Sequence, residues 1–219
     1  MLEKYIEIIQ PYIHNLFQND SSGHDIGHLT RTMNLAINIC EKENGNRLIV
    51  GIAAFMHDIH RIMQNETGKF VSPKASLPKV REILSNTDLS QDIIEKICYC
   101  IENHEHYNWN GKNVEDINTL ILQDADNLDA IGAIGIGRTF SYCGAHNIRM
   151  YDEEIPINTS KDFSDAKGDD LSTIHHFYHK LFHLANNMNT KTAKELAIER
   201  TEFMKKFVDV FLDEWHGKK

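Results

Sequence analysis

One short segment, residues 48–58, constrains the fold of this chain more than any other. It begins with the apolar run Leu48–Met56 and ends in the polar pair His57-Asp58. A run that is apolar on almost every face predicts a helix at the centre of the core, over residues 48–59. A histidine and an aspartate buried side by side are costly unless something pairs with both of them. A divalent cation would satisfy the two side chains together.

The rest of the chain also shows helical spacing, since apolar residues recur in steps of three and four. No stretch alternates with a period of two, so the sequence predicts an all-α fold. Two long polar stretches, 108–113 and 144–169, are expected to be loops. Helices are expected around Ile6–Leu16, from Ile26 to near Gly45, after Pro78, from Ser90 to Ile101, and over 117–133, 171–185 and 190–215.

Bulk properties narrow the class of protein. A length of 219 residues suggests one domain, 1–219, and a net charge of −9 argues against a nucleic acid polymer as partner. No apolar stretch approaches the roughly 20 residues of a membrane span, and the first residues do not resemble a signal peptide. The four cysteines form no CxxC pair, which is typical of reduced thiols. We therefore expect a cytoplasmic protein that does not bind membranes.

Two other segments offer ligands that could complete a metal site with His57-Asp58. The upstream segment 23–31 contains His24 and His28, spaced so that both would lie on one helix face, and either could be a ligand. The downstream segment 123–132 contains Asp124, Asp126 and Asp129 beside apolar residues. Acidic side chains in such a setting are costly to bury unless a partner compensates their charge. The alternative is that all of these residues are ordinary helix caps and surface charges.

The order of His, then His-Asp, then Asp resembles the HD-domain superfamily of metal-dependent phosphohydrolases. The resemblance implies a helical bundle with the metal site between central helices. In that superfamily the first histidine is followed three residues later by a basic residue, which fits His28-Leu-Thr-Arg31 better than His24. The last aspartate precedes a second one, as in Asp126-Asn-Leu-Asp129. The ligands that the resemblance implies are His28, His57, Asp58 and Asp126.

This ligand set has consequences for the metal and its chemistry. Two nitrogens and two oxygens leave room for water in a six-coordinate shell and suit Mn²⁺, Fe²⁺, Co²⁺ or Ni²⁺, with Mg²⁺ or Zn²⁺ as further candidates. A bound cation lowers the pKa of its water and supplies a nucleophile near neutral pH. Dinuclear members of the superfamily need further histidines between the His-Asp pair and the last aspartate. Only His60, His104 and His106 are available there, so we expect one divalent metal ion.

Two residues near the expected ligands are candidates for catalytic roles. His104 continues the inward stripe of Ile93, Ile97 and Ile101, and could protonate a leaving oxygen. It could equally satisfy free carbonyl groups at a helix C-terminus. Asp129 lies one helical turn after Asp126 and could orient the attacking water, or it could form a salt bridge within the helix bundle.

The resemblance extends to a bacterial branch of small cytosolic HD phosphohydrolases, in which nucleoside triphosphate pyrophosphohydrolase activity occurs. It is carried by Asp124–Arg138, by Gly23-His-Asp25, and by His176–Leu181 together with Ala197–Arg200. It implies that His176, Lys180 and Arg200 contact substrate phosphates, whereas Lys74 is expected to be a surface residue. By spacing alone, the three residues His175, His179 and His183 could hold a second metal or be structural.

The sequence therefore predicts a hydrolase that converts a nucleoside triphosphate to the monophosphate and pyrophosphate. Neither a Walker loop nor a nucleophilic serine elbow is present, which favours hydrolysis by metal-bound water over a covalent enzyme. The first alternative is a phosphatase acting on nucleoside monophosphates. More remote alternatives are a di-iron oxygenase of the HD fold and a catalytically silent nucleotide-binding regulator. The expected partner is a small nucleotide or another phosphorylated molecule, and a homodimer is left open.

Overall fold

The computed structural model describes residues 1–18, 23–105, 114–157 and 172–218, and within these ranges it contains helices and no strand. The predicted all-α class is confirmed. The chain divides into two compact units, Met1–Asp126 and Asn127–Lys219, which are called the first and the second unit below. The expectation of one domain over residues 1–219 stays a prediction.

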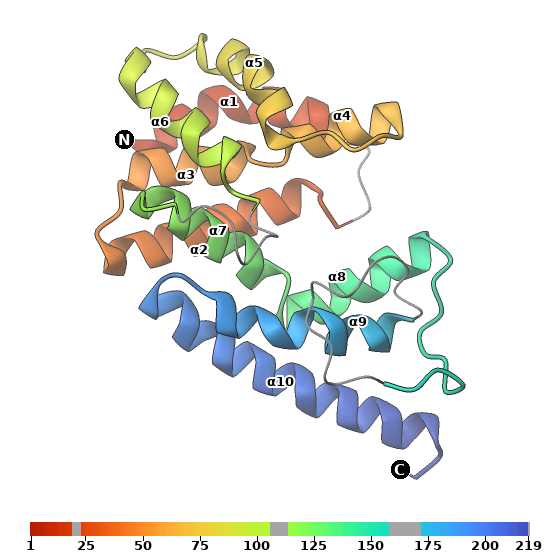
Figure 1. Cartoon of the computed structure of the whole chain (residues 1–219). Coiled ribbons are helices and arrows are strands. Elements are labelled where there is room, and N and C mark those ends of the chain that lie inside the picture. The colour runs from red at the N-terminus through yellow and green to blue at the C-terminus, as the bar shows by residue number, and fades with distance from the viewer. Residues whose placement is uncertain (19–22, 106–113, 158–171, 219) are drawn as a thin grey trace. The chain divides into compact units, whose positions relative to one another are not determined.

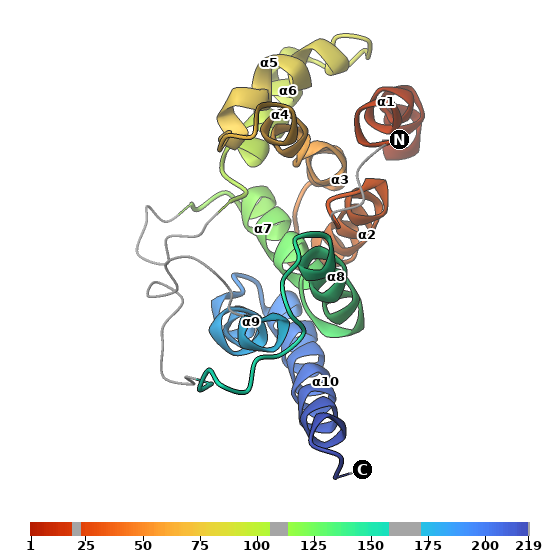
Figure 2. The same cartoon turned by 90° about the vertical axis from the view of Figure 1, so that its right-hand side faces the viewer.

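The first unit is built around a buried helix, α3 (Arg47–Met56), which packs against α1, α2 and α6 (Figures 1 and 2). Figure 2 shows α3 between α2 and the group formed by α4, α5 and α6. Every residue from Ile49 to Met56 is buried, as the apolar run predicts. The other helices of this unit are α1 (Leu2–Phe17), α2 (Ile26–Glu43), α4 (Ile59–Thr67), α5 (Pro73–Leu84), α6 (Gln91–Glu102) and most of α7 (Ile117–Asp129).

The central helix is shorter than the sequence suggests, because it ends at Met56 rather than at residue 59. Asn46 begins it, accepting hydrogen bonds from the N–H groups of Leu48 and Ile49. At the other end the His57 ring donates from Nδ1 to the carbonyl of Ala54, which satisfies one of the free carbonyl groups of the last turn. Asp58 then leaves the helical region, with φ −92° and ψ 13°, and α4 starts after it. The His57-Asp58 pair therefore occupies a helix–helix junction.

Helix α2 has the bounds that the sequence predicts, but its start separates the two candidate histidines. Asp25 caps the helix, and its Oδ1 accepts a hydrogen bond from the backbone N–H of His28 at 2.8 Å. His28 lies in the first turn, whereas His24 precedes the cap. The expectation that both histidines lie on one face of the same helix is wrong, because the cap reorients the chain between them.

The second unit consists of α8 (Gly132–Ala145), α9 (Thr173–His179), a 3₁₀ helix η2 (Leu181–Asn187) and the long helix α10 (Lys191–Trp215) (Figure 1). α10 packs against α8 and η2, and α9 contacts both η2 and α8. Phe140 on α8 meets Phe177 on α9, as well as Phe207 and Phe211 on α10. Phe177 is fully buried in this aromatic cluster, and the other three rings are half-buried.

The expected helix over 117–133 is divided into α7 and α8. The break occurs before Gly132, which has φ +77°, a conformation that other residues rarely adopt. A Cβ atom at this position would lie 2.9 Å from Cγ of Arg200, so the close approach of the Arg200 stem also requires glycine. The glycine-containing run Ile134-Gly-Ile-Gly137 that follows is helical and belongs to α8.

The expected helix over 171–185 is also divided, into α9 and the 3₁₀ helix η2. Lys180 separates the two elements because its backbone, with φ −129° and ψ −60°, leaves the α-helical region. Part of the expected loop 144–169 is confirmed, since no helix is found over 146–157. Residues 158–171 and the expected loop at 108–113 lie outside the described residues.

The four cysteines are free and buried, which agrees with the expectation of reduced thiols. Among the helices described, none is long and apolar enough to cross a membrane.

Candidate metal centre

The four ligands implied by the sequence come together in the first unit. His28 is delivered by the first turn of α2, His57 and Asp58 by the junction of α3 and α4, and Asp126 by α7. Nε2 of His28 lies 3.2 Å from Nε2 of His57, 3.4 Å from Oδ2 of Asp58 and 3.4 Å from Oδ1 of Asp126. Nε2 of His57 lies 3.7 Å and 3.6 Å from the same two oxygens. Each of the two histidine nitrogens thus lies within 3.7 Å of both carboxylates, and His28 and His57 form one candidate metal group with Asp126.

The hydrogen bond of His57 to Ala54 shows that its free nitrogen is suited to a metal. A carbonyl oxygen can only accept, so Nδ1 carries a proton and Nε2 presents a lone pair when the ring is neutral. That lone pair faces the carboxylates of Asp58 and Asp126. A backbone carbonyl bonded to the other ring nitrogen is typical of metal-binding histidines. The residues present therefore fit a divalent cation.

His104 supports the same conclusion. It follows the end of α6 and is buried, so its predicted inward orientation is confirmed. Its Nδ1 donates to the carbonyl of Ile101 at 2.7 Å, while its Nε2 is buried without a hydrogen-bond partner and lies 3.9 Å from Oδ1 of Asp58. A buried nitrogen lone pair that faces a carboxylate needs a cation or a polar ligand between them. His104 forms one candidate metal group with His57 and Asp58.

Charges within the cluster explain its ionisation. Burial raises the pKa of Asp58 and of Asp126, but nearby histidines outweigh it and hold both carboxyl groups well below their usual range. These histidines are His57, His24 and His28 for Asp58, and His28 and His57 for Asp126. Burial lowers the pKa of His57, but Asp58 and Asp126 outweigh it and raise that pKa. Burial and the neighbouring His57 lower the pKa of His104 to about 4, so its ring is neutral near pH 7. The charge of the two carboxylates is thus what raises the pKa of His57.

Several polar residues around the cluster were not assigned from the sequence. The guanidinium of Arg61 pairs with Glu105, and its Nε lies 3.7 Å from Oδ1 of Asp58. His60, a candidate for a second metal, instead has its Nε2 at 3.1 Å from Oε1 of the same Glu105. Arg61 follows Asp58 by three residues and Glu105 follows His104, so spacing along the chain is the signal that points to them. His106 lies outside the described residues.

The two aspartates beside Asp126 are both buried. Oδ2 of Asp129 accepts a hydrogen bond from Arg138 of α8 at 2.9 Å. The structure thus contains the salt bridge that was the alternative to a catalytic role for Asp129. Its role in orienting water stays a prediction, as does the role of His104 as an acid.

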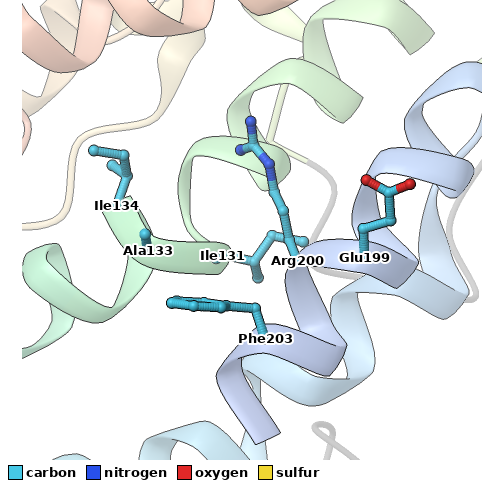
Figure 3. A pocket seen from close by; sticks show the side chains of 7 residues that line it. Ile131, Ala133, Ile134, Glu199, Arg200 and Phe203 are labelled. Carbon is cyan, nitrogen blue, oxygen red and sulfur yellow. The ribbon is translucent and has the colours of Figure 1, made fainter. Parts of the chain in front are cut away.

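The three residues expected to contact substrate phosphates all lie in the second unit. His176 lies on α9, Lys180 follows its last residue, and Arg200 lies on α10. Arg200 donates to the carbonyl of Leu128 and lines a pocket of this unit, shown in Figure 3. Their contacts with phosphate stay predictions. The pocket is lined by Ile131, Gly132, Ala133, Ile134, Glu199, Arg200 and Phe203.

The histidines of the second unit have structural partners. His175 lies with Nε2 at 3.1 Å from the carbonyl of Ile155 and Nδ1 at 2.7 Å from Oγ of Ser172. His183 contacts the carbonyl of Tyr178 at 2.9 Å. Within the described part of the chain, no candidate metal group includes these residues, which favours the structural interpretation.

In the first unit Lys74 is 74% exposed and pairs with Glu102, as expected of a surface residue.

Comparison with known proteins identifies the family. The HD domain family model matches residues 25–131, a range that contains all four implied ligands. Bacillus subtilis YpgQ, described as an uncharacterized protein, is 34% identical over 208 residues, which cover 94% of this chain and 91% of YpgQ. This chain belongs to the HD-domain family.

Solved structures similar to this chain agree with this assignment. A HD-superfamily hydrolase from Bacillus thuringiensis is 32% identical, with a TM-score of 0.74 over 99% of this chain and 100% of that protein. The crystal structure of Bacillus subtilis YpgQ in complex with ADP is 33% identical, with a TM-score of 0.72 over 95% of this chain and 99% of that chain.

Proposed function

We propose that this HD-domain protein is a metal-dependent phosphohydrolase that converts nucleoside triphosphates to monophosphates and pyrophosphate. The observation that carries the proposal is that Nε2 of His28 and Nε2 of His57, which lie 3.2 Å apart, each lie within 3.7 Å of a carboxylate oxygen of both Asp58 and Asp126 in the first unit. One divalent ion, Mn²⁺, Fe²⁺, Co²⁺, Ni²⁺ or Mg²⁺, is proposed to bind there. Such an ion lowers the pKa of a coordinated water and thereby supplies a nucleophile near neutral pH.

The side chains around the proposed metal would hold it, transfer a proton and bind the substrate. Asp58 and Asp126 supply the negative charge that a cation needs, and the Ala54 carbonyl holds a proton on Nδ1 of His57, so that Nε2 of the neutral ring presents its lone pair toward them. His104 presents an unpaired Nε2 that can accept a proton and pass it to a leaving oxygen. We assign phosphate contacts to His176, Lys180 and Arg200, and orientation of water to Asp129, on the resemblance to the pyrophosphohydrolase branch.

Two further facts support a nucleotide as substrate. The chain is 33% identical to YpgQ, which was crystallised in complex with ADP, a nucleotide that carries a diphosphate. The net charge of −9 disfavours a long polyanion, so a small phosphorylated molecule is the better candidate.

The experiment starts from metal-free protein that is reloaded separately with each candidate metal. Nucleoside tri- and monophosphates are then supplied, and phosphate and pyrophosphate are measured separately. We expect pyrophosphate and monophosphate from triphosphates, and only when metal is present. Release of orthophosphate from monophosphates alone would favour the phosphatase.

The same preparation separates the more remote alternatives. Two irons per chain together with an oxidised product would favour the di-iron oxygenase. Nucleotide binding without turnover under every metal would favour the silent regulator. The homodimer remains a separate proposal, which sedimentation of the full chain tests.

A further inference from the structure

His24 contacts the candidate metal centre from outside its ligand set. Its ring precedes α2, held next to the cap Asp25, whose Oδ1 accepts from the backbone N–H of His28. Nδ1 of His24 lies 2.8 Å from Oδ2 of Asp58. The His24 side chain is 31% exposed, whereas those of His28 and Asp58 are 0% and 3% exposed. His24 therefore reaches the cluster from its more open side.

The distances indicate a hydrogen-bond donor rather than a ligand. A separation of 2.8 Å from a carboxylate oxygen is that of a charge-assisted hydrogen bond, so Nδ1 of His24 carries the proton and has no lone pair for a metal. His28 differs, because its Nε2 lies 3.4 Å from both Asp58 and Asp126. The competing interpretation is that His24, His28 and Asp58, which form a candidate metal group, bind an ion directly.

The hydrogen bond from His24 is made to Asp58, whose two carboxylate oxygens face different groups of the cluster. Oδ2 of Asp58 faces His28 and His57, at 3.4 Å and 3.7 Å. Oδ1 faces Arg61 and His104, at 3.7 Å and 3.9 Å. Without a donor on Oδ2, the carboxylate plane could rotate, because the last torsion of an aspartate is broad. A hydrogen bond from His24 fixes that plane.

We propose that His24 is a positioning residue that holds the Asp58 carboxylate in the orientation required for metal binding. This inference rests on the proposed function, since it assumes a metal at the cluster. Partners that hydrogen-bond to ligating carboxylates typically change metal affinity or activity by about 10- to 100-fold when they are removed.

The test compares His24→Asn and His24→Gln, whose side-chain amides place their N–H donors at different positions. In His24→Asn the amide nitrogen takes the position of Nδ1, whereas in His24→Gln it takes that of Nε2. Affinity is measured for Mn²⁺ alone, by competition with a chelating indicator, on the full chain. We expect His24→Ala and His24→Gln to weaken binding by about 10- to 100-fold, and His24→Asn to recover most of the loss. His28→Ala should lose more than His24→Ala, because it removes a ligand.

The controls make the outcomes distinguishable. His14→Asn, at an exposed histidine of α1, should bind Mn²⁺ as the wild type does, and thermal unfolding without metal shows whether each variant is folded. If the wild type binds no metal, the proposed function fails. If the wild type binds Mn²⁺ and His24→Ala binds it equally well, only the positioning role is overturned. If His24→Ala and His24→Asn both lose as much Mn²⁺ affinity as His28→Ala does, His24 is a ligand, and the positioning role is again overturned.

Discussion

At the scale of single residues, His57 joins the secondary structure to the candidate metal centre. Its Nδ1 donates to the carbonyl of Ala54 at the end of α3, and its Nε2 faces Asp58 and Asp126. The residue that ends the central helix is thus also a ligand in the proposed site. Because the helix end and the ligand share one ring, the backbone conformation of the junction determines the direction of the ligand.

The protonation of His57 predicts how metal affinity depends on pH. Burial lowers its pKa in the metal-free protein, but Asp58 and Asp126 outweigh it, so the pKa lies above the usual value. The added proton must leave before Nε2 can coordinate. Mn²⁺ affinity should therefore fall as pH drops through this raised pKa, starting at a higher pH than for a histidine titrating at about 6.5.

This expectation is checked by titrating Mn²⁺ into metal-free protein over a pH series, in buffers of different ionisation enthalpy. Binding should release protons, and the number released should grow as the pH falls through the transition. An affinity that does not change with pH, together with no proton release, would contradict a protonated His57 in the metal-free cluster.

Lys180 separates substrate binding from metal binding. An ammonium group cannot coordinate a cation, so Lys180→Ala should leave the metal content unchanged. Loss of one charge-assisted contact to phosphate costs ~1.5–3 kcal/mol, or about 10- to 150-fold in kcat/KM. The loss should be larger for triphosphates than for monophosphates if the contact is to a terminal phosphate. Lys191→Ala, at an exposed lysine of α10, is the control. An unchanged kcat/KM on the best substrate would remove Lys180 from the site.

At the scale of elements, several residues of the proposed site lie at breaks between helices. The junction of α3 and α4 presents His57 and Asp58, and Lys180 lies between α9 and η2. The break before α8 differs, because Gly132 requires both a positive φ and space for the stem of Arg200. The need for glycine at this break can be tested by measuring the free energy of unfolding of variants.

Gly132→Ala should destabilise the protein by about 1–3 kcal/mol, because alanine is strained at φ +77° and its Cβ would lie 2.9 Å from Arg200. Gly137→Ala is the matched control on the same helix. An added Cβ there meets no atom within 4 Å, and the change should stabilise the helix by about 0.5–1 kcal/mol. Urea unfolding of both variants provides the measurement. Equal stabilities for Gly132→Ala and the wild type would show that the break needs no glycine.

At the scale of the whole molecule, the pattern of residues predicts which side chains come together better than it predicts where the helices break. Apolar periodicity predicts the all-α class, and the family resemblance of the ordered motifs predicts four side chains that lie close together in the fold. Periodicity does not detect the breaks at Asp58 and Lys180, because apolar residues keep their spacing across them. At the first break the His57 ring makes a local hydrogen bond to the carbonyl of Ala54, three residues earlier, which apolar spacing does not reveal. The salt bridge of Asp129 with Arg138 and the contact of His24 with Asp58 depend on the fold.

The central claim is that His28, His57, Asp58 and Asp126 bind one catalytic metal ion. Elemental analysis of purified, metal-reloaded protein tests it most directly, with turnover measured on the same samples. Asp58→Ala and Asp126→Ala each remove a charged ligand, whereas Asp92→Ala removes an exposed carboxylate paired with Lys96 and serves as the control. We expect one metal ion per chain in the wild type and the control, and loss of both metal and activity in the two ligand variants. Full metal occupancy with wild-type turnover in either ligand variant would contradict the assignment.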